Sequence, residues 1–174
     1  MISFYSSQIP KLPDIFTFSQ IFLPFRILLL SDGSLTRHLH IFLGYSMKVQ
    51  ILETAIIPLK DYHYDSIYSK IPYPQISRQI WLIMNKNTKI LYANSIWNEM
   101  VFLKYFKNPE IPLGNWLIQS ELDIFRLIYK VEYIYCYTLE KQFGCRGPFW
   151  TRYYFLIHNG NILASIQEVF SSTL

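Results

Sequence analysis

The sequence predicts an α+β fold in a single domain, with helices packed against an antiparallel β-sheet. Two patterns support this prediction: helix-like segments come first, and hairpin signals dominate from residue 48 onwards. The regular alternation of strands and helices that is typical of a parallel sheet is absent. No internal repeat, low-complexity tract or Ser/Gly-rich linker divides the 174 residues, so we expect one domain over residues 1–174.

Local signals place helices in the first 45 residues. A short helix is expected to end near Gln20, and Pro24 suits the first turn of the next one. Ser34 is a typical N-cap for a helix over residues 35–42, and Gly44 is a typical C-terminal stop.

From residue 48 the spacing of apolar residues changes to that of strands. Residues 49–57 indicate one strand, and the apolar runs 78–84 and 89–94 are joined by Asn-Lys-Asn-Thr, which is a hairpin signal. Residues 98–106 have helical spacing, whereas residues 117–139 fit a helix and a strand equally well.

The last third of the chain predicts a second hairpin. Residues 150–157 alternate between the two faces of a strand, residues 158–161 (His-Asn-Gly-Asn) form a turn signal, and residues 162–170 return as the other arm. Hairpins of this kind build an antiparallel sheet.

Composition excludes several classes of protein. With 51% hydrophobic residues and a formal net charge of only +4, the chain is not of the disordered type. The pI near 9.0 would suit a nucleic acid, but the basic residues are scattered and form no dense stripe, so we expect no nucleic-acid partner. The phosphate-binding glycine motifs, HExxH and GxSxG are all absent, which disfavours nucleotide-binding, zinc-protease and hydrolase functions.

Metal and disulfide chemistry are not indicated either. Cys136 and Cys145 have neither a CxxC motif nor a histidine at zinc-site spacing, so we expect reduced, structural thiols. The histidines do not pair at a helical ligand spacing. We therefore expect no metal site.

A membrane span and a targeting peptide are not expected. The strongest apolar stretch, residues 21–30, contains Pro24 and Arg26 and falls short of the roughly 20 residues that a spanning helix needs. The first 16 residues resemble neither a secretory signal nor an organellar transit peptide. A protein with this sequence that works in an organelle would be made there.

Charged residues occur where the predicted strands would normally carry apolar ones. Arg78 begins one apolar run, Arg152 lies in a strand of aromatic residues, and Glu168 lies near the end of the last strand. These charges either face water or pair with each other, or they point inward. An inward charge is costly to bury, so in the last case the three residues are candidates for a functional site.

Six segments stand out from about residue 24 to the C-terminus: Arg26–Arg37 (RILLLSDGSLTR), Arg78–Leu82 (RQIWL), Tyr92–Asn98 (YANSIWN), Pro112–Gly114 (PLG), Gly147–Tyr153 (GPFWTRY) and Glu168–Phe170 (EVF). In this order and at this spacing they resemble the chorismate pyruvate-lyases, and most closely the cyanobacterial branch with the hypothetical reading frame of algal chloroplast genomes. Residues 1–23 would then be a variable N-terminal extension.

The resemblance implies an antiparallel sheet with helices over an internal ligand pocket. It implies conversion of chorismate to 4-hydroxybenzoate and pyruvate without a cofactor. By the same resemblance, Arg78 binds the ring carboxylate together with the backbone N–H groups of Leu35 and Leu113. Glu168 would hold the 4-hydroxyl or act as general base, and the sequence leaves both roles open. A bidentate arginine is well suited to hold a carboxylate in a fixed orientation.

The leaving enolpyruvyl group gains negative charge, so a second cation near it is expected. We expect Arg152 to supply it, with Arg37 as the substitute. The chain departs from bacterial members of the family at two positions that bear on the pocket. Leu35 replaces a methionine, and Asn94 stands at about the position of an arginine, which removes a charge.

Three functions remain open at this point. The first is the lyase, and the second is a non-catalytic binding module for 4-hydroxybenzoate or a related aromatic acid. The third is an RNA- or membrane-associated protein without a pocket. Following the resemblance, we expect a monomer whose partner is a small aromatic acid, located in the plastid and encoded there.

Overall fold

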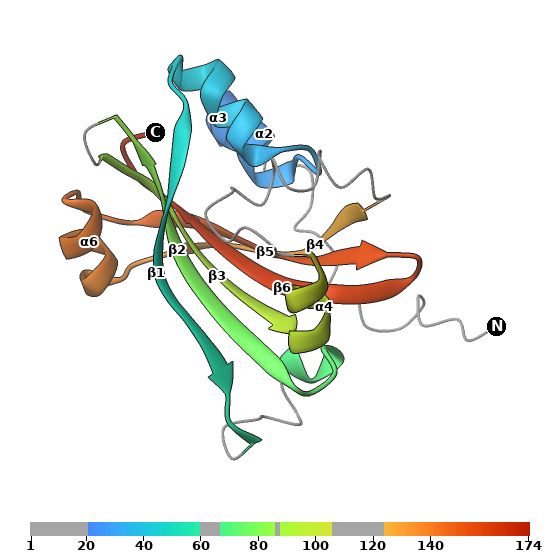
Figure 1. The fold of residues 1–174 in the computed structure, drawn as a ribbon. Helices are drawn as coiled ribbons and strands as arrows, with labels where there is room; N and C mark the ends of the chain where they lie inside the picture. The colour runs from blue at the N-terminus through green and yellow to red at the C-terminus, as the bar shows by residue number, and fades with distance from the viewer. Residues whose placement is uncertain (1–20, 60–66, 86–87, 106–123) are drawn as a thin grey trace.

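The computed structural model describes residues 21–59, 67–85, 88–105 and 124–174. In this part of the chain a six-stranded antiparallel sheet has the strand order β1-β2-β3-β6-β5-β4 (Figure 1). The strands are β1 (Met47–Ile57), β2 (Gln75–Met84), β3 (Thr88–Asn98), β4 (Ile124–Ile134), β5 (Phe149–His158) and β6 (Asn161–Phe170). The helices are α2 (Leu23–Leu30), α3 (Leu35–Leu43), α4 (Glu99–Tyr105), α6 (Tyr137–Phe143) and the short 3₁₀ helix η2 (Ile67–Lys70).

This architecture confirms the predicted α+β class with an antiparallel sheet. Strands β1, β2 and β3 follow one another across half of the sheet, and β4, β5 and β6 follow one another inward from the opposite edge. Strand β6 then pairs with β3 and joins the two halves. Residues 78 and 168, which are 90 positions apart in the chain, thereby come to lie in neighbouring parts of one sheet.

Both predicted hairpins are present. Asn159 and Gly160 connect β5 and β6 and have φ values of +48° and +74°, the left-handed pair that a two-residue type I′ turn requires. Asn85 begins the turn between β2 and β3 with a φ of +49°, while residues 86 and 87 lie outside the described part of the chain.

The helix predictions are confirmed within the described residues, with one difference in detail. Helix α3 begins directly after Ser34 and ends at Gly44, which adopts a φ of +73°. The Ser34 side chain does not cap the helix, because its hydroxyl instead pairs with that of Thr36 at 3.1 Å. The helix expected to end near Gln20 lies outside the described residues.

The two faces of the sheet are covered by different helices. Helices α2 and α3 lie together over one end of the sheet, and α6 lies apart from them beside the strands (Figure 1). Under α2 and α3, buried leucines such as Leu29 and Leu39 pack on the residues of β2 and β3 that point to that side. Trp97 and Phe102 join a second cluster at the other end of the same face, next to α4. We call this side of the sheet the pocket face.

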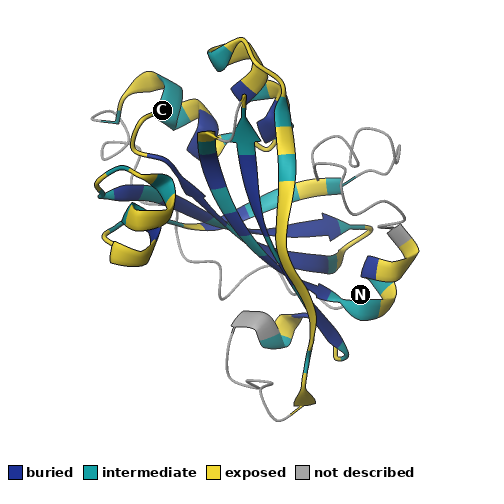
Figure 2. Cartoon of the chain, turned by 60° about the vertical axis from the view of Figure 1, so that its left-hand side comes forward, coloured by how far each residue is buried: buried dark blue, intermediate teal, exposed yellow. Residues whose placement is uncertain are grey.

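The opposite face carries the cluster around α6. Trp81 is 1% exposed and packs with Leu139, Phe149 and Val169. Strand β1, at the edge of the sheet, is largely exposed (Figure 2). No helix in the described part of the chain is long and apolar enough to cross a membrane.

Replacement of Leu29 by alanine should destabilise the protein by about 2–5 kcal/mol, because this fully buried side chain anchors α2 to the sheet. The matched control is Leu23→Ala in the same helix, where the side chain is 57% exposed and the loss should stay below about 1 kcal/mol. Urea unfolding followed by circular dichroism measures both changes. Equal losses for the two variants would show that α2 does not dock through Leu29.

Candidate ligand pocket

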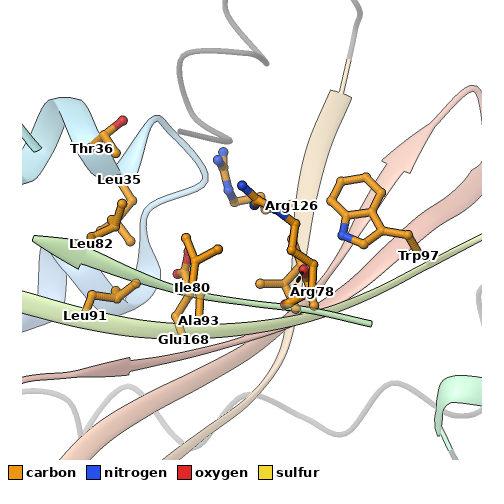
Figure 3. A pocket seen from close by; sticks show the side chains of 12 residues that line it. Leu35, Thr36, Arg78, Ile80, Leu82, Leu91, Ala93, Trp97, Arg126 and Glu168 are labelled. Carbon is orange, nitrogen blue, oxygen red and sulfur yellow. Dashed lines mark hydrogen bonds between the residues drawn. The ribbon is translucent and has the colours of Figure 1, made fainter. Parts of the chain in front are cut away.

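A pocket opens on the pocket face between the two apolar clusters, below the beginning of α3 (Figure 3). Its empty volume, including open solvent at the mouth, is about 490 Å³. The walls are mostly apolar, with a few polar groups between them. The lining residues are Leu35, Thr36, Arg78, Ile80, Leu82, Leu91, Ala93, Ser95, Trp97, Arg126, Ile166 and Glu168.

The register of the strands explains why polar residues meet here. Arg78 of β2 lies opposite Ser95 of β3, and the Ser95 hydroxyl donates to the Arg78 carbonyl at 3.1 Å. One step further along, Ala93 of β3 lies opposite Glu168 of β6. Because side chains two positions apart point to the same face, Arg78 and Glu168 both project toward the pocket.

Arg78 is nearly completely buried, with 3% of its surface exposed. Burial lowers the pKa of Arg78 to about 10, so the guanidinium is still charged at neutral pH. The alternative in which this charge faces water is therefore wrong, and the structure places Arg78 in the pocket wall as the inward alternative predicted.

Helix α3 begins at the pocket wall. Leu35 and Thr36, its first two residues, line the cavity. The first N–H groups of an α-helix have no acceptor within the helix, and the helix dipole favours negative charge near them. Leu35 thus brings the beginning of α3 to the same cavity as Arg78, while Leu113 lies outside the described residues.

Glu168 is held by two neighbours. One carboxylate oxygen pairs with Nε of Arg152 at 2.6 Å, and the other accepts a hydrogen bond from the Tyr154 hydroxyl at 2.9 Å. Burial, and then the negative charge of Glu168, raise the pKa of Tyr154 far above its usual value, so the phenol remains protonated and donates. The carboxylate orientation is therefore fixed.

Arg152 occupies a different place from the expected one. It is fully buried, does not belong to the pocket lining and lies directly opposite Glu168 in the β5–β6 register. Its Nη1 donates to the carbonyls of Leu28 at 2.7 Å and Ser31 at 2.9 Å, at the end of α2. The sequence alternative in which Arg152 and Glu168 pair with each other is confirmed. The structure gives Arg152 a positioning contact with Glu168, and the described pocket lining does not include it.

Two further residues named from the sequence are not in the pocket wall. Arg37 is an exposed residue of α3. Asn94 lies between the pocket-lining residues Ala93 and Ser95, so its side chain belongs to the opposite face of the sheet. Arg37 is therefore not among the cations of the described pocket wall, and the side chain of Asn94 does not face the pocket, so its lack of charge does not alter the charge of that wall.

The second cation in the pocket wall is Arg126 of β4, which sequence analysis missed. Residues 117–139 fitted helix and strand equally well, so no face could be assigned to Arg126. The observed register pairs it with Leu156 of β5, on the same face as Glu168. Assignment of the segment as a strand would have shown an inward-facing arginine. Within the described residues, no group of three or more His, Cys, Asp or Glu side chains could hold a metal ion.

Replacement of Arg152 by methionine should destabilise the protein by about 3–5 kcal/mol, because it leaves the Glu168 carboxylate buried without its counter-ion. The double variant Arg152→Met/Glu168→Met should recover part of this loss, since it removes both charges. Chemical unfolding of the wild type, of the two single variants Arg152→Met and Glu168→Met and of the double variant gives the double-mutant cycle.

The matched control is Lys130→Met, which breaks the exposed Lys130–Glu132 pair and should cost less than about 1 kcal/mol. A loss at Arg152 no larger than this control would rule out the positioning role of the buried pair.

Comparison with known proteins supports both the family and the fold. The family model described as chorismate pyruvate-lyase Rv2949c-like matches residues 29–174. The chain is 37% identical over 149 residues to the uncharacterized protein ycf21 of Porphyra purpurea, a match that covers 86% of this chain and 81% of that protein. The ycf21 protein of Cyanophora paradoxa is 34% identical over 84% of this chain and 76% of its own length. The name ycf21 denotes a plastid-genome reading frame, which confirms the predicted plastid location and organellar encoding.

Solved structures share the fold at low identity. The effector domain of PhnF from Mycobacterium smegmatis aligns with a TM-score of 0.62 at 9% identity, over 83% of this chain and 92% of that domain. A gene product of Staphylococcus aureus, SA0254, aligns with a TM-score of 0.58 at 12% identity, over the same shares. Given the match of the family model over residues 29–174 and the identity to the plastid relatives, the chain belongs to the Rv2949c-like chorismate pyruvate-lyase family.

Proposed function

We propose that this protein binds chorismate in the pocket and cleaves it to 4-hydroxybenzoate and pyruvate without a cofactor. The observation that carries the proposal is the meeting of Arg78, the beginning of α3 and Glu168 around one cavity with apolar walls. These groups complement a cyclic carboxylate that bears a hydroxyl on the far side of its ring. Membership of the chorismate pyruvate-lyase family supports the same substrate.

The proposed reaction is an elimination that needs no oxidant. The ring carbon that bears the hydroxyl loses its proton to a base, a role that the family resemblance leaves open for Glu168, and the electron pair of that C–H bond enters the ring. The neighbouring C–O ether bond breaks, so enolpyruvate leaves with the bonding pair and takes up a proton to become pyruvate. The ring becomes aromatic, which supplies the driving force, and the protein contributes mainly orientation and charge placement.

In this proposal each residue type has a defined task. Arg78 and the backbone N–H of Leu35 bind the ring carboxylate, as does Leu113 by the family resemblance. Glu168 anchors the ring hydroxyl, since each carboxylate oxygen can accept more than the one bond that Arg152 or Tyr154 already gives it. Arg152 keeps Glu168 in place.

The direct test is to incubate the purified protein with chorismate and to follow pyruvate and 4-hydroxybenzoate together by chromatography. Equal release of both products, above the rate of the protein-free control, supports the proposed reaction. Absence of both products with a folded protein would contradict it.

Arg78→Ala should abolish product release, because the ring carboxylate then loses its buried cation. Arg37→Ala is the matched control, since Arg37 is exposed and is not in the pocket lining, and its rate should stay within about twofold of wild type. Steady-state kinetics on both variants measures the difference. A fully active Arg78→Ala variant would remove Arg78 from the site.

Carboxylate binding should be independent of pH between 7 and about 9 and should weaken above about pH 10, where the Arg78 guanidinium loses its proton. The probe is 4-(hydroxymethyl)benzoate, whose hydroxyl does not titrate in this range, and its dissociation constant is measured by calorimetry. Circular dichroism at each pH checks that the fold persists. The residual binding of the probe by Arg78→Gln should not weaken above about pH 10. If the variant shows the same weakening, another group is responsible for the pH dependence.

A second candidate is a non-catalytic binding module for 4-hydroxybenzoate or a related aromatic acid. The observation that favours it is the shared fold with the effector domain of PhnF and with the ligand-binding domain of a GntR-family regulator from Bordetella bronchiseptica. A rise of the melting temperature with 4-hydroxybenzoate, without release of pyruvate from chorismate, would favour this candidate over the lyase.

A further inference from the structure

Arg126 lies in the pocket wall across from the residues that the proposed function uses. It belongs to β4 at one edge of the sheet, whereas Arg78 belongs to β2 near the other edge, with three strands between them. Both nevertheless line the same pocket, so the sheet curves around it. The two guanidinium groups point into the same space (Figure 3).

The surroundings of Arg126 contain no carboxylate partner in the described part of the chain. Its Nη1 donates to the main-chain carbonyl of Asp32, and its guanidinium lies 5.7 Å from the centre of the Tyr154 ring. Its Nε is buried and makes no hydrogen bond. Glu168, the acidic residue of the described pocket lining, is already paired with Arg152. A half-buried cation whose described partners are all neutral favours an anionic ligand.

We propose that Arg126 binds a second carboxylate of the ligand, so that the pocket selects aromatic or cyclic dicarboxylates over monocarboxylates. This inference rests on the proposed function for the orientation of the ligand. With the ring carboxylate on Arg78 and the ring hydroxyl on Glu168, an ether-linked carboxylate on the carbon next to the hydroxyl reaches the β4 side of the pocket. There Arg126 offers Nε and a terminal nitrogen, the pair of donors that holds a carboxylate in bidentate fashion.

Two matched probes separate the second carboxylate from the rest of the ligand. The dicarboxylate 3-(carboxymethoxy)-4-hydroxybenzoate and the monocarboxylate 4-hydroxy-3-methoxybenzoate share the ring, the hydroxyl and the ether oxygen, and neither can undergo the elimination. Calorimetry on the wild-type protein should show that the dicarboxylate binds about tenfold tighter or better.

Arg126→Gln should reduce this preference to about twofold or less and leave the affinity for the monocarboxylate nearly unchanged. Arg126→Lys keeps the charge but not the bidentate geometry and should retain part of the preference. The control Lys130→Gln removes an exposed charge from the same strand and should leave both affinities as they are.

The proposal is overturned if the wild type does not prefer the dicarboxylate, if Arg126→Gln keeps the preference, or if that variant weakens both probes equally. These outcomes do not depend on turnover. A protein that prefers the dicarboxylate but releases no pyruvate contradicts the lyase and supports the Arg126 site. A protein that releases pyruvate but shows no preference supports the lyase and contradicts the Arg126 site.

Discussion

The buried ion pair between Arg152 and Glu168 is the constraint on which the rest of the structure depends. A charge in the interior is costly unless it is paired. Here each carboxylate oxygen has a donor, and Nε and Nη1 of Arg152 are bonded, while its buried Nη2 makes no hydrogen bond. The pair thus does more than join two neighbouring strands. It also links the end of α2 to the sheet by hydrogen bonds, in addition to the apolar contacts of Leu28 and Leu29.

Both sides of the pocket therefore share one charged network. Arg152 donates to the Ser31 carbonyl, Arg126 donates to the Asp32 carbonyl, and α3 begins a few residues later with Leu35 and Thr36, which line the cavity. The same Arg152 fixes the orientation of Glu168 on the floor of the pocket. A ligand that bridges the beginning of α3 and Glu168 consequently meets two groups whose separation is already set, which lowers the ordering cost of binding.

Local signals account for what the sequence predicted well. The Asn-Gly turn, the alternation in β5 and β6 and Gly44 after α3 each depend on a few neighbouring residues, and all were found. The site needed more than local information. That Arg78 and Glu168 face one cavity follows from the pairing of β3 with β6, which lie far apart in the chain, and only the family resemblance anticipated it. Arg126 was missed because the apolar residues of its segment show no clear helical or strand period. The expectation for Arg152 did not foresee that its Nη1 donates to the carbonyls of Leu28 and Ser31.

Asn94 shows that the presence of a charged residue on a strand does not by itself place that charge in the pocket, because neighbouring residues of a strand point to opposite faces. Its neighbours Ala93 and Ser95 line the pocket, so a shift of a single residue in the comparison with other family members decides whether position 94 belongs to the pocket at all. The sheet brings residues of β2, β6 and β4 around the same cavity, so cations from strands that are not neighbours meet there. Arg78 on β2 and Arg126 on β4 place two guanidinium groups in the wall of one cavity without any charge on β3, an arrangement that suits a ligand with two carboxylates.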